Sequence, residues 1–356
     1  MKKILLDASR LPEFDNHELV AFTADRKSGL KSFIAIHNTN LGPATGGTRY
    51  WAYDSEEEAF RDVLRLSRAM TYKCALARVP YGGGKGVIIA NSHHPRRRKI
   101  LAAYAKRVNL LEGSFYTGED VGITPDDISV LARQSHFIIG REKFAGDPSP
   151  WAALGVFFAL QAGLEVVFGN ADITGRTFAV KGLGKVGGAL CELLYRRGGT
   201  LIGADIDPDR VRSAKRRFPR IKIVEAKEIH RQRVDVYAPC ALGGDFNKKT
   251  IPQLRCQVIC GGANNQLSSE KDGERLHGWG ILYIPDYLAN AGGLINVVSE
   301  LDKRGYSSRR VRKKVKDIRK TAKKIIMLSE KLNKPTSDVA DRLAERIFKN
   351  GKRRKK

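Results

Sequence analysis

The sequence has few of the features that mark a secreted, membrane-spanning or metal-stabilised protein. Among its 356 residues are only five cysteines, which form no C-x-x-C pair and have no histidine at zinc-finger spacing. A run of about 18 apolar residues, which a membrane helix needs, is absent, and residues 1–14 lack the apolar core of a signal peptide. We therefore expect a cytoplasmic protein with free thiols, no metal site and no membrane contact.

Acidic residues are also scarce, because 38 Asp and Glu stand against 64 Lys and Arg and the formal net charge is +26. Residues 302–356 alone contain 22 Lys and Arg and six Asp and Glu, a surplus of +16, and the chain ends in the basic run 352–356. Such a run either contacts nucleic acid or is a solvated tail. Only Tyr306 and Phe348 are available in this segment for base stacking. We therefore do not expect nucleic acid to be the partner.

What the sequence does contain is a composition suited to a sizeable folded core, with 42% hydrophobic and 29% charged residues. Its length favours two domains, and the pattern changes after residues 148–150. We predict an α/β fold in three parts. These are an N-terminal α/β substrate-binding and catalytic domain at residues 1–148, a Rossmann-type dinucleotide-binding domain at residues 149–308, and C-terminal helices with the basic tail at residues 309–356.

In the first half, β-type runs predict neighbouring strands at residues 19–22 and 32–36. A capping box at Ser55 begins a helix that we expect to end near Tyr72. A glycine-rich loop at residues 81–86 should follow. In the second half, β-type runs alternate with helical segments, which predicts βαβ units on a parallel sheet. These runs are residues 178–180, 201–204, 234–237, 257–259 and 281–284.

The strongest motif of the second half is a G-x-G-x-x-G fingerprint that follows a predicted strand and opens a helix, the setting that a dinucleotide site requires. Gly182 should make the tight turn, Gly184 should let the backbone approach a pyrophosphate, and Gly187 should let the helix close on the strand. Amides at the helix start, including those of Lys185 and Val186, would hold the phosphates. The sequence therefore predicts a dinucleotide cofactor.

The choice between NAD and NADP depends on Asp205, which lies 18 residues after Gly187, close to the spacing expected of an acid that binds the ribose hydroxyls. Its charge would repel a 2′-phosphate, which favours NAD. Arg210 and Arg212 are nearby, however, and an arginine accommodates that phosphate in NADP-binding proteins.

The first half contains two lysines in apolar or glycine-rich surroundings, Lys73 and Lys85. The three glycines before Lys85 remove the side chains that would crowd its ammonium group. Two ammonium groups in one cleft disfavour each other's protonation, and a neutral lysine can act as a general base. Asp120 precedes a helix start at Thr124 and, beside a lysine, would stay ionised and pass protons. The alternative without a catalytic role is that the two lysines are solvated and the aspartate forms a loop.

At these positions the sequence resembles the amino-acid dehydrogenases of the glutamate, leucine, phenylalanine and valine group, most strongly the leucine dehydrogenases. Several separate motifs in the right order carry the resemblance. They are Leu41-Gly42-Pro43-Ala44, Gly46-Gly47-Thr48, Met70-Thr71-Tyr72-Lys73, Gly82-Gly83-Gly84-Lys85, Glu119-Asp120-Val121-Gly122, Pro148-Ser149-Pro150, the Gly182 fingerprint, Ala238-Pro239-Cys240-Ala241-Leu242-Gly243, Ala263-Asn264-Asn265-Gln266-Leu267 and Asn290-Ala291-Gly292-Gly293.

The resemblance implies an oxidoreductase that converts an L-amino acid and NAD to a 2-oxo acid, ammonia and NADH. Lys73 would then bind the substrate carboxylate, Lys85 would activate the water that attacks the imine, and Asp120 would shuttle protons at the amino nitrogen. Asn264, Asn265 and Asn290 would hold cofactor and substrate in a closing cleft between the domains. Relatives are homo-oligomers, commonly octamers, so we expect a homo-oligomer here.

The resemblance also predicts the class of substrate. Four apolar residues and one glycine match positions that surround the substrate in relatives, and the absence of an additional cation among them argues against glutamate. These residues are Leu41, Gly42, Met70, Leu294 and Val297. Branched-chain amino acids (leucine, valine, isoleucine) are favoured, as in branched-chain amino-acid catabolism. Space beside Gly118 leaves tryptophan or phenylalanine as an alternative.

Two features leave a different alternative open, a non-catalytic relative that binds nucleic acid. One is the basic tail. The other is Ala152, which stands where the family has a threonine near the nicotinamide amide.

Overall fold

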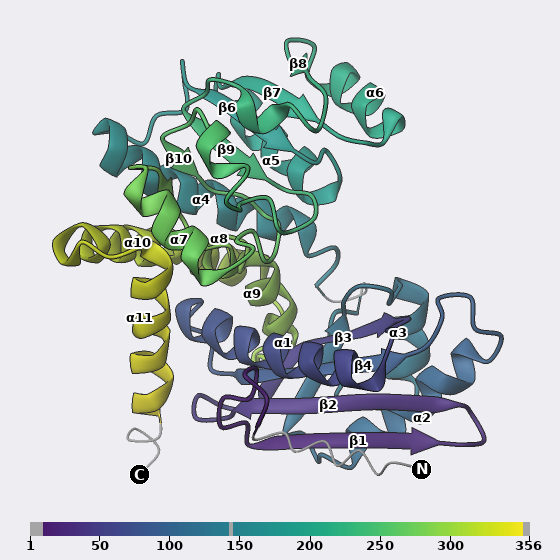
Figure 1. The fold of residues 1–356 in the computed structure, drawn as a ribbon. Helices are drawn as coiled ribbons and strands as arrows, with labels where there is room; N and C mark the ends of the chain where they lie inside the picture. Colours follow the sequence, from purple (N-terminus) through teal and green to yellow (C-terminus); the bar gives the residue numbers. More distant parts are fainter. Residues whose placement is uncertain (1–9, 142–144, 352–356) are drawn as a thin grey trace. The chain divides into compact units, whose positions relative to one another are not determined.

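The computed structural model describes residues 10–141 and 145–351, so the basic run 352–356 lies outside the described residues. The chain divides into two compact units, each with its own sheet (Figure 1). Unit 1 comprises the described residues within Met1–Gly146, Val297–Tyr306 and Ala344–Lys356, and unit 2 comprises Asp147–Asn296 and Ser307–Leu343.

Unit 1 is built on a five-stranded sheet in the order β1-β2-β4-β3-β5. The contacts of β1 with β2 and of β2 with β4 are antiparallel, whereas β3 runs parallel to β4 and β5. The strands are β1 (Leu19–Asp25), β2 (Leu30–Asn38), β3 (Ala44–Trp51), β4 (Gly82–Ile89) and β5 (Phe115–Glu119), and the helices are α1 (Glu56–Leu76), α2 (Arg97–Asn109) and α3 (Pro125–Ala132).

Alternating residues of the strands face two different helical layers, as the period of two in a strand requires. Phe33 and Val87 pack in one apolar cluster with Phe60 of α1. Ile34 and its neighbours on the opposite face pack in a second cluster with Ile100 of α2. The central strands of the sheet are therefore buried on both faces.

Two expectations for the first half were wrong. The helix that begins after Ser55 continues to Leu76 instead of ending near Tyr72, because Cys74, Ala75 and Leu76 are buried and extend its apolar face. The predicted glycine-rich loop is not a loop, because all residues from Gly82 onward lie in β4, which is hydrogen-bonded to strands on both sides. The predicted N-cap is correct, since the Ser55 side chain accepts a hydrogen bond of 3.0 Å from the Glu58 N–H.

Unit 2 contains an entirely parallel six-stranded sheet in the order β11-β10-β9-β6-β7-β8. This is the order of a doubly wound dinucleotide-binding fold, in which the topology switches between β6 and β9. The α/β fold class and the Rossmann-type sheet are thus confirmed. The strands are β6 (Thr177–Lys181), β7 (Thr200–Ala204), β8 (Lys222–Ile223), β9 (Val236–Pro239), β10 (Val258–Ile259) and β11 (Leu282–Tyr283).

Several helices of the second half pack against this sheet, and others continue toward the C-terminus. Among the described residues, α4 (Ser149–Phe168) alone is long and apolar enough to cross a membrane, and its most apolar window is 61% buried, as in a core helix. The others are α5 (Lys185–Tyr195), α6 (Pro208–Arg217), α7 (Glu270–Gly278), α8 (Asp286–Ala289), α9 (Gly292–Val298), α10 (Ser308–Leu332) and α11 (Thr336–Gly351), with short 3-10 turns at Ile229–Arg231, Ile251–Gln253 and Ser299–Leu301. Residues 336–343 of α11 belong to unit 2 and residues 344–351 to unit 1.

The five cysteines are free, and all but Cys240 are buried, which confirms the expectation of free thiols. Burial raises the pKa of the Cys74 thiol to about 12, so this group stays protonated and behaves as a small apolar side chain.

Two histidines pack edge to face on the sheet side of α1, with ring centroids 4.9 Å apart. His17 Nε2 lies 3.0 Å from the Leu64 carbonyl oxygen, and His37 Nδ1 lies 2.8 Å from Thr71 Oγ1. Burial, followed by the neighbouring His17, lowers the pKa of His37 to about 4, although Asp15 opposes the shift. Both rings are therefore neutral at pH 7, and protonation of either is unfavourable.

The buried histidines predict a loss of stability in acid. Because the pKa of His37 is about 4 in the folded chain and 6.5 when unperturbed, the unfolded state takes up the proton first as the pH falls. The free energy of unfolding should therefore fall between pH 6.5 and pH 4, with His37 contributing up to about 3 kcal/mol. Urea denaturation of His37→Gln should show a weaker pH dependence than wild type, whereas exposed His93→Gln should leave it unchanged. Equal slopes in all three proteins would contradict this.

Candidate active site

Strand β4 carries a run of glycines because other parts of unit 1 approach its backbone closely. A Cβ atom on Gly83 would lie 2.1 Å from the Thr71 amide nitrogen in α1, and one on Gly86 would lie 1.9 Å from the Tyr104 hydroxyl in α2. Real Cβ atoms do not approach other atoms this closely, so neither position accepts a side chain. Lys85, between these glycines, is only 6% exposed.

Lys85 forms a short ion pair with Asp120, which follows β5. The two residues come from strands that are not neighbours, because β3 lies between β4 and β5. Glycine in β3 makes the contact possible, since a Cβ on Gly47 would lie 2.8 Å from Asp120 Cβ. The pair predicted from the sequence to act together is thus in direct contact.

Asp120 is held as a carboxylate. Burial alone would raise its pKa, but the ammonium group of Lys85 and then the guanidinium group of Arg49 outweigh burial and hold the pKa below its ordinary value. The Asp120 side chain is 19% exposed and that of Lys85 8%. A buried carboxylate that stays ionised beside a lysine is equipped to accept and return a proton.

Three other residues predicted from the sequence, Met70, Lys73 and Leu41, also belong to unit 1. Met70 lies in α1, and its Cγ would lie 3.1 Å from a Cβ on Gly46 in β3. Lys73 lies three residues further along α1 and is half-buried. The side chain of Leu41 is directed instead toward the end of α11, where its Cδ2 would lie 2.9 Å from a Cβ on Gly351.

Two further predicted residues, Gly42 and Val297, also belong to unit 1. Gly42 has a φ angle of 150°, and a Cβ there would lie 2.2 Å from the Pro80 carbonyl oxygen. Val297, in α9, lies beside Gly140. The space expected beside Gly118 is absent, because a Cβ there would lie 2.6 Å from the Ile139 carbonyl oxygen. Gly118 therefore provides no room for a large substrate side chain.

The fingerprint of unit 2 forms the tight turn from β6 into α5. Gly182 has a φ angle of +92°, and a Cβ on Gly187 would lie 1.8 Å from the Gly182 carbonyl oxygen, so the helix lies directly on the turn. Helix α5 begins at Lys185, and its N-cap, Gly184, makes no side-chain cap. Backbone amides at a helix start that no side chain caps can bind a pyrophosphate. Val186 lies in the first turn of α5, against Gly262.

Asp205 follows β7 and faces the fingerprint. Its carboxylate accepts hydrogen bonds from the N–H groups of Leu183 at 2.7 Å and Asp207 at 2.9 Å. Arg210 Nη1 lies 3.7 Å from Asp205 Oδ2 and would lie 3.4 Å from a Cβ on Gly184. Arg212, the other arginine near the predicted ribose site, forms a short ion pair with Asp209 at the surface. Only Arg210 of these two therefore contacts the predicted cofactor loop.

The predicted asparagines lie after β10 and β11, at the carboxyl edge of the parallel sheet where such folds bind ligands. Asn290 donates a hydrogen bond of 2.7 Å to the Asn264 side-chain oxygen, and Asn265 has a φ angle of 53°. Leu294 is half-buried in α9. Ala152, which stands where a threonine was expected, packs beside Gly293. A Cβ atom added to Gly293 would lie 3.6 Å from the Cβ of Ala152.

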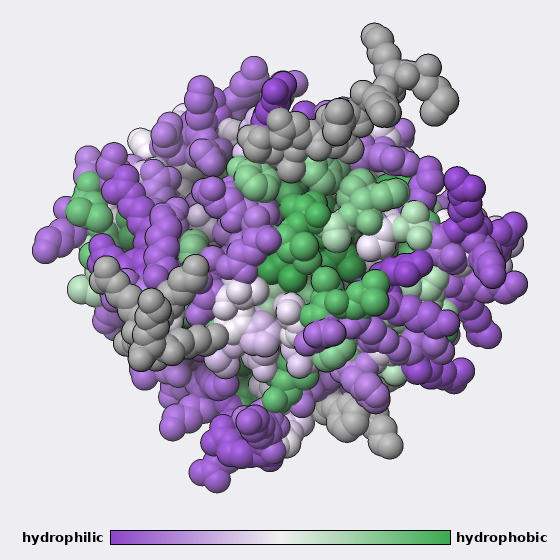
Figure 2. All heavy atoms as spheres, turned by 90° about the horizontal axis from the view of Figure 1, so that it is seen from below, coloured by the Kyte–Doolittle hydropathy of each residue, from purple (hydrophilic) through white to green (hydrophobic). Residues whose placement is uncertain are grey.

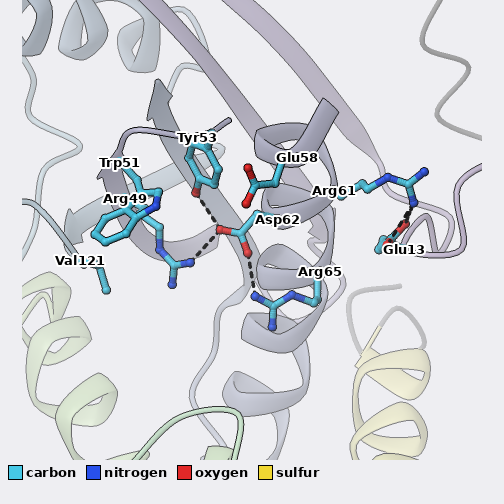
Figure 3. Close-up of a pocket in the computed structure, with 9 residues that line it drawn as sticks. All are labelled: Glu13, Arg49, Trp51, Tyr53, Glu58, Arg61, Asp62, Arg65 and Val121. Atoms are coloured by element: carbon cyan, nitrogen blue, oxygen red, sulfur yellow. Dashed lines mark hydrogen bonds and ion pairs between the residues drawn. The ribbon is translucent and has the colours of Figure 1, made fainter. Parts of the chain in front are cut away.

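Sequence reasoning missed Arg49, which contacts Asp120 and leads to a surface pocket of about 440 Å³ (Figure 3). The one available signal was its position directly after the Gly46-Gly47-Thr48 motif. The pocket is lined by Glu13, Arg49, Trp51, Tyr53, Glu58, Arg61, Asp62, Arg65 and Val121.

Comparisons with known proteins show which family the chain is similar to. The profile described as Glu/Leu/Phe/Val dehydrogenase, dimerisation domain, matches residues 17–141, and the profile described as Glutamate/Leucine/Phenylalanine/Valine dehydrogenase matches residues 207–345. The chain is 44% identical over 340 residues to L-tryptophan dehydrogenase of Nostoc punctiforme, covering 95% of each protein. The crystal structure of L-tryptophan dehydrogenase from that organism superposes with a TM-score of 0.84 at 43% identity, covering 95% of this chain and 97% of the other.

Relatives with other named substrates are equally similar. Leucine dehydrogenase of Bacillus cereus is 43% identical over 338 residues, which cover 94% of this chain and 91% of the relative. Phenylalanine dehydrogenase of Caldalkalibacillus thermarum is 42% identical over 340 residues, with the same coverage. Overall identity therefore does not rank the three side chains as substrates.

The close approach of α1 to β4 predicts the effect of one added methyl group. Gly83→Ala would place a Cβ 2.1 Å from the Thr71 nitrogen, so α1 would have to move away from the strand that carries Lys85. We expect the free energy of unfolding to fall by roughly 2 kcal/mol or more, measured by urea denaturation. Gly278→Ala, where a Cβ meets no atom within 4 Å, is the control and should be neutral or slightly stabilising. A Gly83→Ala protein as stable as wild type would contradict the packing described.

Proposed function

This chain belongs to the Glu/Leu/Phe/Val dehydrogenase family and is an amino-acid dehydrogenase by that membership, and from this premise we propose that it oxidatively deaminates a branched-chain L-amino acid with NAD. The products are the 2-oxo acid, ammonium, NADH and one proton. The observation that supports this reaction most directly is the buried ion pair of Lys85 and Asp120, in which a potential base and a potential proton carrier touch.

The roles proposed for the side chains follow from their charges and positions. Lys73, in α1, binds the substrate carboxylate with its ammonium group. NAD, when held by the residues of unit 2, would supply the acceptor for the hydride of the substrate α-carbon. Lys85 takes a proton from the water that adds to the resulting imine, and Asp120 moves protons to and from the substrate nitrogen. One water is consumed and one proton is released for each ammonium formed, so atoms and charge balance.

The cofactor residues proposed in unit 2 fit a dinucleotide. Gly184 has no side chain to keep a pyrophosphate from the backbone, and the uncapped amides of α5 can bind its oxygens. Asp205 suits the ribose hydroxyls. NAD is favoured over NADP because Arg210 is already engaged by two carboxylates, Asp205 at 3.7 Å and Asp207 at 3.3 Å. Asn264, Asn265 and Asn290 are proposed to complete the site.

Branched-chain substrates are proposed first because the residues expected to meet the side chain, among them Met70, Leu294 and Val297, are apolar, and a buried apolar pocket favours aliphatic groups. Tryptophan and phenylalanine are the second proposal, which rests on the similarity to enzymes named for these substrates and not on space at Gly118. We further propose a homo-oligomer, because the profile that matches residues 17–141 is described as a dimerisation domain. The octamer is the form that the resemblance to the family implies. The free thiols suit the reducing cytoplasm.

The proposed reaction is tested by the formation of NADH from NAD and single amino acids at alkaline pH. We expect leucine, valine and isoleucine to give the highest kcat/KM and Lys85→Met to lower kcat by at least about 1,000-fold, because the base is lost while a side chain of similar length fills its place. Lys99→Met, an exposed lysine of α2, is the control. No NADH from any of these substrates, tryptophan or phenylalanine would overturn the proposal.

The cofactor preference is tested by releasing Arg210 from its carboxylate. Asp205→Ser removes the charge that repels a 2′-phosphate and pairs with Arg210, so the ratio of NADPH to NADH affinity should rise by about 10-fold or more. Fluorescence titration of the reduced cofactors measures both affinities. Asp209→Asn, whose partner is Arg212 at the surface, should not change the ratio. An unchanged ratio in Asp205→Ser would rule Asp205 out as the discriminating residue.

A further inference from the structure

Arg49 connects the proposed catalytic carboxylate to a second, fixed carboxylate of unit 1. It lies near the end of β3, one residue after Thr48, which pairs with Gly86 in β4 and Glu119 in β5. Its Nε atom lies 3.7 Å from Asp120 Oδ2, and its Nη1 atom donates a hydrogen bond of 2.7 Å to Asp62 Oδ2. The Arg49 side chain is only 20% exposed.

The Asp62 end of this connection is rigidly held (Figure 3). Asp62, in α1, accepts hydrogen bonds of 2.7 Å from three donors, Arg49, the Tyr53 hydroxyl and Arg65. Burial and the adjacent Asp62 carboxylate raise the pKa of Tyr53, so Tyr53 remains a neutral donor. Asp62, itself held by these three hydrogen bonds, therefore keeps the guanidinium group of Arg49 in place.

The Asp120 end is different, because the contact is one of charge and not a hydrogen bond. Arg49 Nε is buried and has no hydrogen-bond partner among the described residues, and 3.7 Å exceeds hydrogen-bond length. Asp120 is faced by Lys85 from β4 and by Arg49 from β3, and by the backbone N–H of Val121. Asp120 can thus move or exchange protons without breaking a hydrogen bond to Arg49.

The two cations beside Asp120 are not equivalent. A lysine can lose its proton, as Lys85 must when it acts as a base, whereas an arginine remains charged at any pH an enzyme meets. When Lys85 is neutral, Arg49 is the cation that still faces the buried carboxylate. Without Arg49, Asp120 would then lack a charged partner in a site that disfavours an isolated charge.

We propose that Arg49 is a positioning residue of the reaction, which keeps Asp120 ionised and directed toward Lys85 throughout the proton transfers. Arg49 acts through Asp120 and is not proposed to touch substrate or cofactor. Its role in turnover rests on the function proposed above, but its effect on the ionisation of Asp120 does not. The Asp62 and Tyr53 contacts serve to hold the guanidinium in place.

The experiment compares Arg49→Met and Arg49→Lys with a matched control, Arg65→Met. Arg65 also binds Asp62 and carries the same charge, but no contact joins it to Asp120 among the interactions of the described residues. In Arg49→Met the acidic limb of the profile of kcat/KM against pH should move up by about one unit. At pH values below that limb, kcat should fall by about 10-fold with little change in KM for the amino acid. Arg49→Lys should restore most of the profile, and Arg65→Met should retain it.

A second measurement is independent of turnover. The carboxyl ¹³C signal of Asp120, assigned by its loss in Asp120→Asn, is titrated in wild type and in the variants, and thermal denaturation confirms that each protein is folded. The pH midpoint of this titration should rise in Arg49→Met and remain unchanged in Arg65→Met. An unchanged midpoint in Arg49→Met, or an equal rise in Arg65→Met, would overturn the proposal. If wild type oxidises no amino acid while the midpoint still rises, the proposed reaction fails and the link from Arg49 to Asp120 stands.

Discussion

A buried carboxylate must have a cation beside it, and much of unit 1 is arranged to meet that constraint. Asp120 and Lys85 come from strands separated by β3 and still touch. Their contact requires Gly47 in the strand between them, and α1 and α2 pack closely on Gly83 and Gly86, the glycines of the strand that carries Lys85. The glycines of this unit therefore allow a charged pair to be buried between closely packed backbones, where its partners are fixed before a substrate binds.

The two units have separate parts in this arrangement. Unit 1 contains the titratable pair and its arginine, whereas unit 2 has the parallel sheet, the fingerprint turn and the asparagines after β10 and β11. Some of the charges of unit 2 are also paired locally. Glu165 of α4 binds Arg319 and Lys323 of α10 at 2.8 Å each. Part of the basic surplus near the C-terminus thus holds helices together instead of being free to bind another molecule.

Features governed by local rules could be predicted from the sequence. The cap at Ser55, the fingerprint at Gly182 and the alternation of strands and helices depend on neighbouring residues and on backbone conformation. Features that depend on tertiary packing were mistaken or missed. The glycines of β4 were taken for a loop, because nothing local shows that α1 and α2 press on them. Gly118 suggested open space that Ile139 fills, and the contact of Arg49 with Asp120 can be recognised only when β3 and β5 lie side by side.

The central claim is that Lys85 and Asp120 act as one unit, and a double-mutant cycle on kcat/KM tests it most directly. Lys85→Met, Asp120→Asn and the combined variant are assayed with the best amino-acid substrate and NAD. If the pair functions together, the double variant should be about as active as the weaker single variant, because the first substitution already removes the shared step. Losses that multiply in the double variant would show that the two side chains act independently and would contradict the account.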